Sequence, residues 1–258
     1  DLAVEEGDFY ALLGPNGAGK TTAIGIISSL VNKSGGEVEI FGHSIDTDLE
    51  AAKACIGIVP QEINVNLWEK VGNVVSNQAG YYGIGGKLAK ERVEKYLRAL
   101  RLWDRRNDIA RSLSGGMKRR LMIARALVHE PRLLILDEPT AALGVKQAGV
   151  VLKYILQARN RGIGVIFITH NPHHAYPVAD HFVILRRGMV YGDYTKAELP
   201  LEQLVQMMAG GADLEVLQHD HVGPRGEHQQ EDVVAVGRAD TDMPVFTGQQ
   251  RFEGAVHG

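Results

Sequence analysis

Short hydrophobic runs near the start of the chain predict strands around one glycine-rich loop. Residues 8–14 (DFYALLG) form an apolar run rich in strand-forming residues, and GPNGAGKTT follows directly. Residues 23–31 then place apolar side chains at helical spacing, and the runs at 35–42 and 55–60 predict two further strands. Strand, glycine-rich loop and helix in this order are typical of a phosphate-binding loop.

The pattern becomes helical between about residues 62 and 129 and then returns to strands. Residues 87–103 alternate charge with Leu, Val and Tyr at three- and four-residue steps, which predicts a solvated amphipathic helix. Residues 115–130 predict a second helix, apolar on one side and basic on the other. The apolar runs 132–139 and 162–170 are too short for buried helices, so they predict parallel central strands.

Residues 181–194 predict a terminal hairpin that turns at Arg187-Gly188. The tail from about His219 is rich in Gly, Gln and charged residues and is expected to be loosely ordered. Alternation of strands and helices over the rest of the chain predicts an α/β sheet with helices on both faces.

Composition and charge argue against several classes of protein but do not by themselves identify the function. A net charge of −3 gives no sign of a broad basic surface, so we expect no nucleic-acid partner. The single cysteine, Cys55, excludes an internal disulfide and fits a reducing compartment. No apolar run approaches the ~18 residues that span a bilayer. The acidic opening DLAVEEGDFY predicts a trimmed start rather than a signal peptide.

The glycine-rich loop fills the pattern G-x-x-x-x-G-K-[ST] at every position from Gly14 to Thr21. Backbone amides of such a loop wrap a β-phosphate, and the following helix adds its positive N-terminal end. We expect Lys20 to reach the β- and γ-phosphates and Thr21 to ligate Mg²⁺. The predicted nucleotide-binding residues are Gly14, Pro15, Asn16, Gly17, Ala18, Gly19, Lys20, Thr21 and Thr22.

Two carboxylates end the apolar run LLILDE. Asp137 is expected to hold Mg²⁺ through water, because Mg²⁺ usually keeps several waters. Glu138 is expected to polarise the water that attacks the γ-phosphate. The alternative is a strand that simply leaves the core through polar residues.

Two polar residues end other predicted strands. His170 follows VIFIT and is expected to hydrogen-bond the γ-phosphate at the same edge of the sheet. Its alternatives are a metal site with His173 and His174, and a core histidine. Gln61 follows IGIVP and is expected to orient water or to ligate Mg²⁺.

The stretch LSGGM at 113–117 predicts a second anion site. Ser114 is a suitable N-cap, and Gly115 and Gly116 leave amides free at a positive helix end. One chain rarely needs two phosphate sites so far apart, so we expect two chains, each offering this helix end to the other's γ-phosphate.

The order and spacing of these motifs resemble those of the ATPase of ABC transporters. The motifs are Gly14–Thr22, Gln61, Leu113–Met117, Leu133–Glu138 and His170. The resemblance covers roughly residues 1–195. It implies a P-loop NTPase with a RecA-like α/β core, an antiparallel β-edge and a helical signature subdomain. It also implies hydrolysis of Mg²⁺-bound ATP by a head-to-tail homodimer or heterodimer, peripheral to the cytoplasmic face of the plasma membrane, with integral-membrane permease subunits as partners.

The implied boundaries are an ATPase domain over 1–218, with its core at 1–62 and 131–195, a helical subdomain at about 63–130 and an extension at 196–218, followed by the polar tail 219–258. Two features depart from the family. Its usual adenine-stacking aromatic lies well before the phosphate loop, and here that strand is expected to be cut away. Its loop after the carboxylates usually has Asp where this chain has Gly144.

The two halves of the chain resemble different branches of the family. The segments GDFYALLGPNGAGKTT and LSGGMKRRLMIARAL resemble ATPases of ABC-2-type exporters, whereas DEPTAALGVKQ resembles single-domain ATPases of monosaccharide importers, which also use a periplasmic sugar-binding protein. We favour a join between two related genes near residues 137–144 over a single divergent ATPase. A non-transport ABC ATPase and a catalytically silent nucleotide-binding module are the alternatives from other classes.

Overall fold

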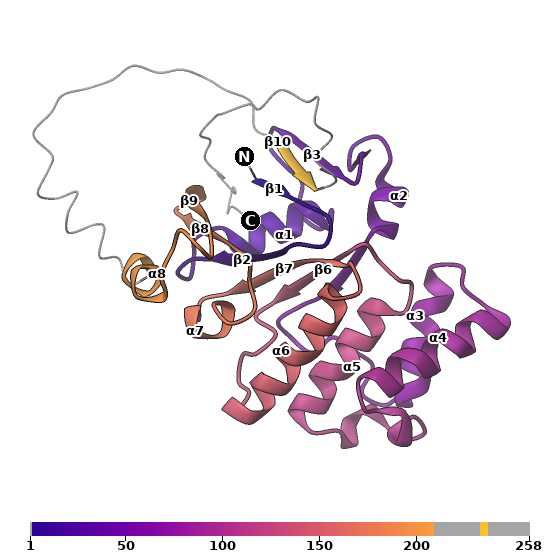
Figure 1. The fold of residues 1–258 in the computed structure, drawn as a ribbon. Coiled ribbons are helices and arrows are strands. Elements are labelled where there is room, and N and C mark those ends of the chain that lie inside the picture. Colours follow the sequence, from indigo (N-terminus) through magenta and orange to yellow (C-terminus); the bar gives the residue numbers. More distant parts are fainter. Residues whose placement is uncertain (1, 209–232, 237–258) are drawn as a thin grey trace, which may run out of the picture. The chain divides into compact units, whose positions relative to one another are not determined.

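The computed structural model describes residues 2–208 and 233–236, and the chain divides into two compact units. Unit 1 comprises Asp1–Glu5, Phe9–Leu49 and Ile168–Gly258. Unit 2 comprises Glu6–Asp8 and Glu50–Phe167. Strand β7 (Gly164–Thr169) begins in unit 2 and ends in unit 1. Figure 1 labels most elements of both units.

The other elements of unit 1 are β1 (Leu2–Val4), β2 (Phe9–Leu13), α1 (Lys20–Ile27), β3 (Glu37–Ile40), β4 (His43–Ser44), α7 (Pro172–Ala175), β8 (His181–Arg186), β9 (Met189–Thr195), α8 (Leu201–Met208) and β10 (Val233–Val236). Those of unit 2 are α3 (Val71–Tyr81), α4 (Gly86–Ala99), α5 (Gly115–Leu127), α6 (Val145–Arg159), β5 (Ile56–Val59), β6 (Leu133–Asp137) and two 3₁₀ turns, Trp103–Arg105 and Ala110–Ser112. Helix α2 (Leu49–Ala54) starts at the last residue of a unit 1 segment.

In unit 1 the strand before the glycine-rich loop lies beside the predicted hairpin. Every residue of β2 is buried, and β2 pairs in parallel with β8 from Tyr10 opposite His181 to Leu13 opposite Ile184. Strand β8 turns back antiparallel into β9. Arg187 and Gly188 both have positive φ, 50° and 78°, as a tight hairpin turn requires. The predicted hairpin and its turn are confirmed.

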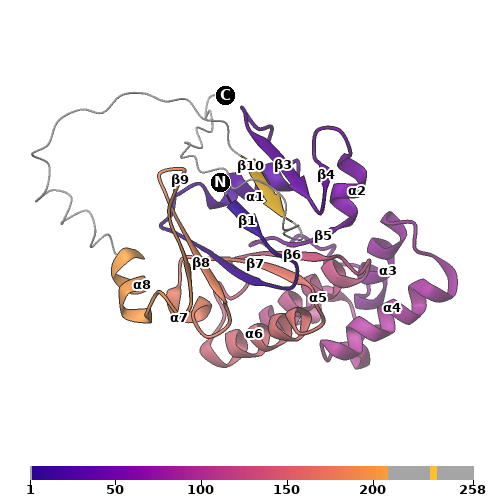
Figure 2. The same ribbon diagram turned by 45° about the horizontal axis from the view of Figure 1, so that its top comes forward.

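A second sheet of unit 1 has the order β1-β10-β3-β4. Strand β10 pairs in parallel with both neighbours, Val234 opposite Leu2 on one side and opposite Val38 on the other. Figure 2 shows β10 between β1 and β3. The rest of the tail from His219 onwards lies outside the described residues, so its predicted looseness stays a prediction.

In unit 2 a parallel sheet is combined with a group of helices. Strands β5, β6 and β7 are neighbours in this order, and β5 pairs in parallel with β6. Helices α3, α4 and α5 contact one another. The apolar runs at 132–139 and 162–170 therefore form the buried strands β6 and β7, as predicted. Unit 2 is wider than the predicted helical subdomain at 63–130, because it also contains β5, β6 and α6.

Three predicted helices have different ends. The helix predicted at 87–103 begins at Gly86 and ends at Ala99, ahead of Arg101 with its φ of 54°. The helix predicted at 23–31 begins at Lys20 and ends at Ile27. It stops because Ser29 has a φ of 57° and the amides of Leu30 and Val31 both donate to the carbonyl of Gly25. The helix predicted at 115–130 ends at Leu127, ahead of Glu130 with its φ of 60°. Over the described parts of the chain, no helix has the length and apolarity that crossing a membrane requires.

Candidate nucleotide-binding site

The glycine-rich loop joins β2 to α1, as predicted, and rests on the hairpin turn of β8 and β9. Gly14 has a φ of 154°, and a Cβ there would overlap the carbonyl oxygen of Leu185. The amide of Gly188 donates to the carbonyl of Ala18 at 3.1 Å. Only a residue without a side chain allows this approach of the loop to β8. The contact with the hairpin was not predicted from the sequence.

Lys20 holds the loop in its present shape. Its side chain is buried (8% exposed), and Nζ donates to the carbonyls of Gly14 at 2.7 Å and Pro15 at 2.9 Å. Helix α1 starts at this lysine with no side-chain N-cap and no acidic residue in its first turn. Thr21 is exposed and Thr22 is half-buried. A cation, an uncapped helix N-terminus and a hydroxyl thus lie together, which suits a phosphate group.

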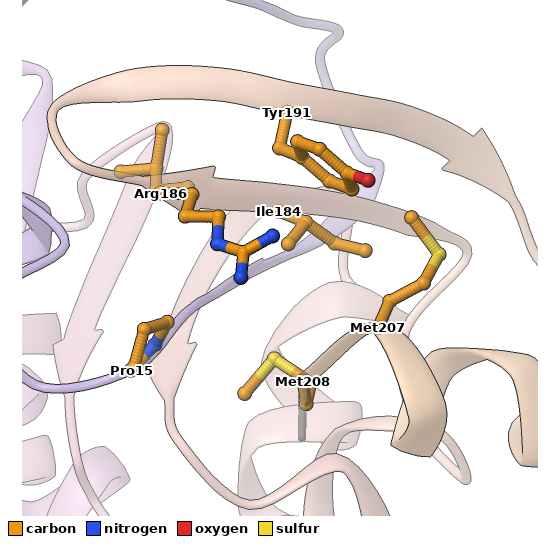
Figure 3. Close-up of a pocket in the computed structure, with 7 residues that line it drawn as sticks. Pro15, Ile184, Arg186, Tyr191, Met207 and Met208 are labelled. Carbon is orange, nitrogen blue, oxygen red and sulfur yellow. The ribbon is translucent and has the colours of Figure 1, made fainter. Parts of the chain in front are cut away.

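A small pocket of about 220 Å³ lies beside the start of this loop (Figure 3). Its lining residues come from the loop, the hairpin and α8: Pro15, Ile184, Leu185, Arg186, Tyr191, Met207 and Met208. Figure 3 shows the Arg186 side chain extending from β8 towards Pro15 and Met208. The volume is below the ~300–1,000 Å³ of typical ligand pockets. We therefore place phosphate binding on the loop itself.

In unit 2 the two predicted carboxylates stand at the end of β6. Asp137 is half-buried and Glu138 is buried (6% exposed). Glu138 has a φ of 42°, and its carbonyl accepts the amide of Ala141 at 3.0 Å in a tight turn. A non-glycine residue in this region costs about 1–3 kcal/mol and is typical of functional sites. The strand does not simply run out into solvent through polar residues.

The residues of the predicted second anion site lie at the start of α5. Ser114 is the N-cap, and its Oγ accepts the amide of Met117 at 3.4 Å, which confirms the predicted cap. Ser114 and Gly115 are exposed. Gly116 is buried, and a Cβ added there would contact the side chain of Gln147 in α6. The helix end is therefore exposed to solvent at Ser114 and Gly115.

Gln61 lies just after β5 with an exposed side chain, and its backbone is held by α5. The guanidinium of Arg119 donates to the carbonyl of Pro60 at 2.7 Å and to that of Gln61 at 2.6 Å. Burial lowers the pKa of Arg119, and the charge of Asp137 acts in the opposite direction. Gln61, α5 and Asp137 are thus connected within unit 2. Arg119 is only 4% exposed, although the sequence predicts one basic side for this helix and no signal marks this arginine as buried.

Residues 1–141 match the sequence family described as ABC transporter. The chain belongs to the ABC transporter family.

Individual relatives of this ABC-family chain carry out different tasks. It is 34% identical over 188 residues to the Nod factor export ATP-binding protein I of Cupriavidus metallidurans, covering 73% of this chain and 62% of that one. It is 30% identical over 257 residues to the fructose import ATP-binding protein FruK of Bifidobacterium longum, covering 95% of this chain and 50% of that one. The chain therefore spans between half and two thirds of the length of these relatives.

A solved ABC cassette has the same fold. The structure, a dimeric ATP-binding cassette in a post-hydrolysis state bound to ADP and Pi, has 27% sequence identity and a TM-score of 0.66. The match covers 75% of this chain and 87% of the chain of the solved cassette. The predicted fold class, a P-loop NTPase of the ABC type, is confirmed.

Two further residues that the ABC resemblance singles out, His170 and Gly144, lie where helices begin. His170 is exposed at the end of β7, and Asn171 and Pro172 then start α7, which contains His173 and His174. Gly144 is the N-cap of α6 and has open space where a Cβ would be. At this position, where the family is expected to carry Asp, an added Cβ would thus meet no neighbouring atom.

Proposed function

We propose that this chain is the ATP-binding and ATP-hydrolysing subunit of an ABC transporter. The observation that carries the proposal is the phosphate loop, with the buried Lys20 cation on the Gly14 and Pro15 carbonyls and the uncapped start of α1 beside it. The membership in the family and the match to a cassette bound to ADP and Pi support the same activity.

We assign catalytic roles to three residues. Lys20 binds the β- and γ-phosphates, Glu138 polarises the attacking water, and His170 stabilises the γ-phosphate. Phosphoryl transfer leaves the protein mainly positioning and electrostatic work, which suits groups held by a buried strand and a rigid loop.

The proposed Mg²⁺ ligands fit the ion chemically. The exposed hydroxyl of Thr21, the half-buried carboxylate of Asp137 and the exposed amide of Gln61 offer oxygen atoms, which Mg²⁺ prefers. When bound, the ion neutralises charge on the phosphate oxygens.

We further propose that two such chains form a head-to-tail dimer with ATP between them. Ser114, Gly115 and Gly116 would contact the γ-phosphate bound by the other chain. The exposed helix end at Ser114 and Gly115 supports this, since its amides remain accessible to an anion from outside the chain. The dimeric state of the matching cassette supports it as well.

The dimer is tested by light scattering after size exclusion. Glu138→Gln, which slows hydrolysis, is expected to be a dimer in Mg-ATP and a monomer without nucleotide. Adding Ser114→Arg is expected to abolish the dimer without loss of ATP binding. Ser112→Arg is the matched control, because Ser112 is also exposed but lies before the cap. A dimer that forms without nucleotide, or that survives Ser114→Arg, would refute the shared site.

Membrane permease subunits are the proposed partners, at the cytoplasmic face of the plasma membrane. Large apolar side chains are exposed along the helical part of unit 2: Ile63, Trp68, Tyr81, Leu88 and Ile109. Such exposure fits a surface that contacts another protein. Copurification of the chain with the permease encoded beside it tests this partner, and a chain recovered alone in mild detergent would count against it.

Export and import remain two candidate directions. Similarity to a Nod factor export protein favours an exporter, whereas the match to FruK over 95% of the chain favours sugar import, with a periplasmic sugar-binding protein as a further partner. We propose the join near residues 137–144 as the origin of this mixture. The neighbouring genes distinguish the two: a sugar-binding protein and a permease indicate import, and an ABC-2 permease indicates export.

A further inference from the structure

A buried arginine of α5 is attached to the backbone of the loop that carries Gln61. Arg119 is 4% exposed, and its two terminal nitrogens donate to the successive carbonyls of Pro60 and Gln61 at 2.7 and 2.6 Å. The two bonds use the planar fork of the guanidinium, which a lysine ammonium does not reproduce. The fork therefore fixes the direction in which the chain leaves β5.

The same helix holds the loop at a second point. Arg125 donates to the carbonyl of Asn64 at 3.0 Å and to its Oδ1 at 2.7 Å. Residues 60–64 thus contact α5 at both ends, while the side chain of Gln61 stays exposed. This arrangement fixes the backbone of the loop and leaves the Gln61 amide available to a ligand.

A cation at this depth needs an explanation beyond packing. The Nε of Arg119 is buried and has no hydrogen-bond partner among residues 2–208 and 233–236. Burial lowers the pKa of Arg119, and the charge of Asp137 opposes that effect. Replacing a buried ion pair by well-packed apolar side chains of similar volume is often neutral or stabilising. An incompletely satisfied guanidinium is therefore a poor choice for stability alone.

We propose that Arg119 is a positioning residue for ATP hydrolysis, which fixes Gln61 to the helix that starts at Ser114. Because α5 is one rigid element, a movement of its N-terminal end is passed to Gln61 through the fork. The side-chain amide of Gln61 then reaches the position in which it acts only when the start of α5 is in contact with the γ-phosphate. This inference rests on the proposed ATPase function and adds a residue that acts through Gln61.

The first test measures the loop itself, independently of activity. In the full chain, Arg119→Lys is expected to speed hydrogen–deuterium exchange of the amides at 61–66 several-fold, since the fork is lost. Arg120→Lys is the matched control, because Arg120 lies on the same helix and donates to the carbonyl of Leu100 at 2.9 Å, away from the loop. Equal exchange in Arg119→Lys and wild type would overturn the inference. This result does not depend on whether the wild type hydrolyses ATP.

The second test is a double-mutant cycle on steady-state ATPase kinetics. Arg119→Lys is expected to lower kcat about tenfold with little change in KM, because misplacing a group by about an ångström costs one to two orders of magnitude. Arg120→Lys should stay within about twofold of the wild type. In a Gln61→Ala background, Arg119→Lys should have no further effect, as expected for residues that act as one unit. Additive losses would contradict the role through Gln61, and an inactive wild type would contradict the proposed function instead.

If Arg119→Lys does not fold, Arg119→Gln is measured in its place, since its amide nitrogen can still donate. Urea unfolding of each variant shows whether stability has changed. A purely structural role predicts that kcat losses persist in the Gln61→Ala background, and this outcome would also overturn the inference.

Discussion

His129 is expected to make the stability of unit 2 fall as the pH drops below about 6.5. It follows α5, and its ring stacks on the ring of Tyr82. The two ring centroids are 3.7 Å apart, and the angle between the ring planes is 1°. Its Nε2 lies 2.9 Å from the carbonyl of Ile56 and donates to it in the neutral ring. Its Nδ1 is buried without a hydrogen-bond partner in the described part of the chain. Protonation would place a second N–H, and a charge, in this site.

The magnitude follows from the pKa of this ring. Burial, together with the nearby charge of Arg92, lowers the pKa of His129 from 6.5 to about 4, although the carbonyl of Ile56 acts in the opposite direction. Between these values the unfolded chain binds a proton that the folded chain does not, so stability rises with pH. The contribution is complete above pH 6.5 and is lost as the pH falls towards 4. At about 1.4 kcal/mol per pKa unit, the loss by pH 5 is about 2 kcal/mol.

The assay is urea unfolding at pH 7.5, 6.0 and 5.0, followed by circular dichroism, for the wild type and His129→Phe. Phenylalanine keeps a flat ring against Tyr82 but does not titrate. Other titrating groups act on both proteins, so the difference between the two free energies of unfolding isolates His129. The difference should shrink by about 2 kcal/mol from pH 7.5 to pH 5.0. A difference that is independent of pH would refute this account of His129.

Three further substitutions test the described contacts. Gly57→Ala should destabilise the chain by about 1–3 kcal/mol or more, since the added Cβ overlaps the Ala126 carbonyl and lies 2.9 Å from Pro131; an unchanged melting temperature would contradict the close packing of α5 on β5. Gly144→Asp should raise stability by a few tenths of a kcal/mol as an N-cap of α6, and a loss in thermal unfolding would show that the position needs glycine. Lys20→Ala should lose ATP affinity in calorimetry, because the cation that faces the phosphates is removed; undiminished affinity would reject the phosphate-loop assignment.

The local parts of the site could be predicted from the sequence because their chemistry is encoded in consecutive residues. The pattern from Gly14 to Thr21 specifies both the loop and the helix that follows, and Ser114 caps its helix as its residue type predicts. The alternating pattern likewise gave α4, which buries Ala89, Val93, Tyr96 and Leu97.

Contacts between distant residues could not be predicted in this way. Arg119 and the carbonyl of Gln61 are 58 positions apart, and nothing in the helical pattern of α5 distinguishes an arginine that turns inwards from one that faces water. The contact of Gly188 with Ala18 depends on which strand lies beside β2, which periodicity does not show. The end of α1 was missed because the apolar spacing continues to Val31 although Ser29 leaves the helix.

We infer that this ABC-family chain hydrolyses ATP with Glu138 as the residue that activates water. The decisive measurement is phosphate release from Mg-ATP by the wild type, Glu138→Gln and the control Glu37→Gln, an exposed glutamate on β3. Positioned general bases contribute about 10²–10⁴ in rate, so Glu138→Gln should be at least ~10²-fold slower. Its affinity for ATP should be retained, and Glu37→Gln should match the wild type. Equal turnover of Glu138→Gln and the wild type would contradict the account.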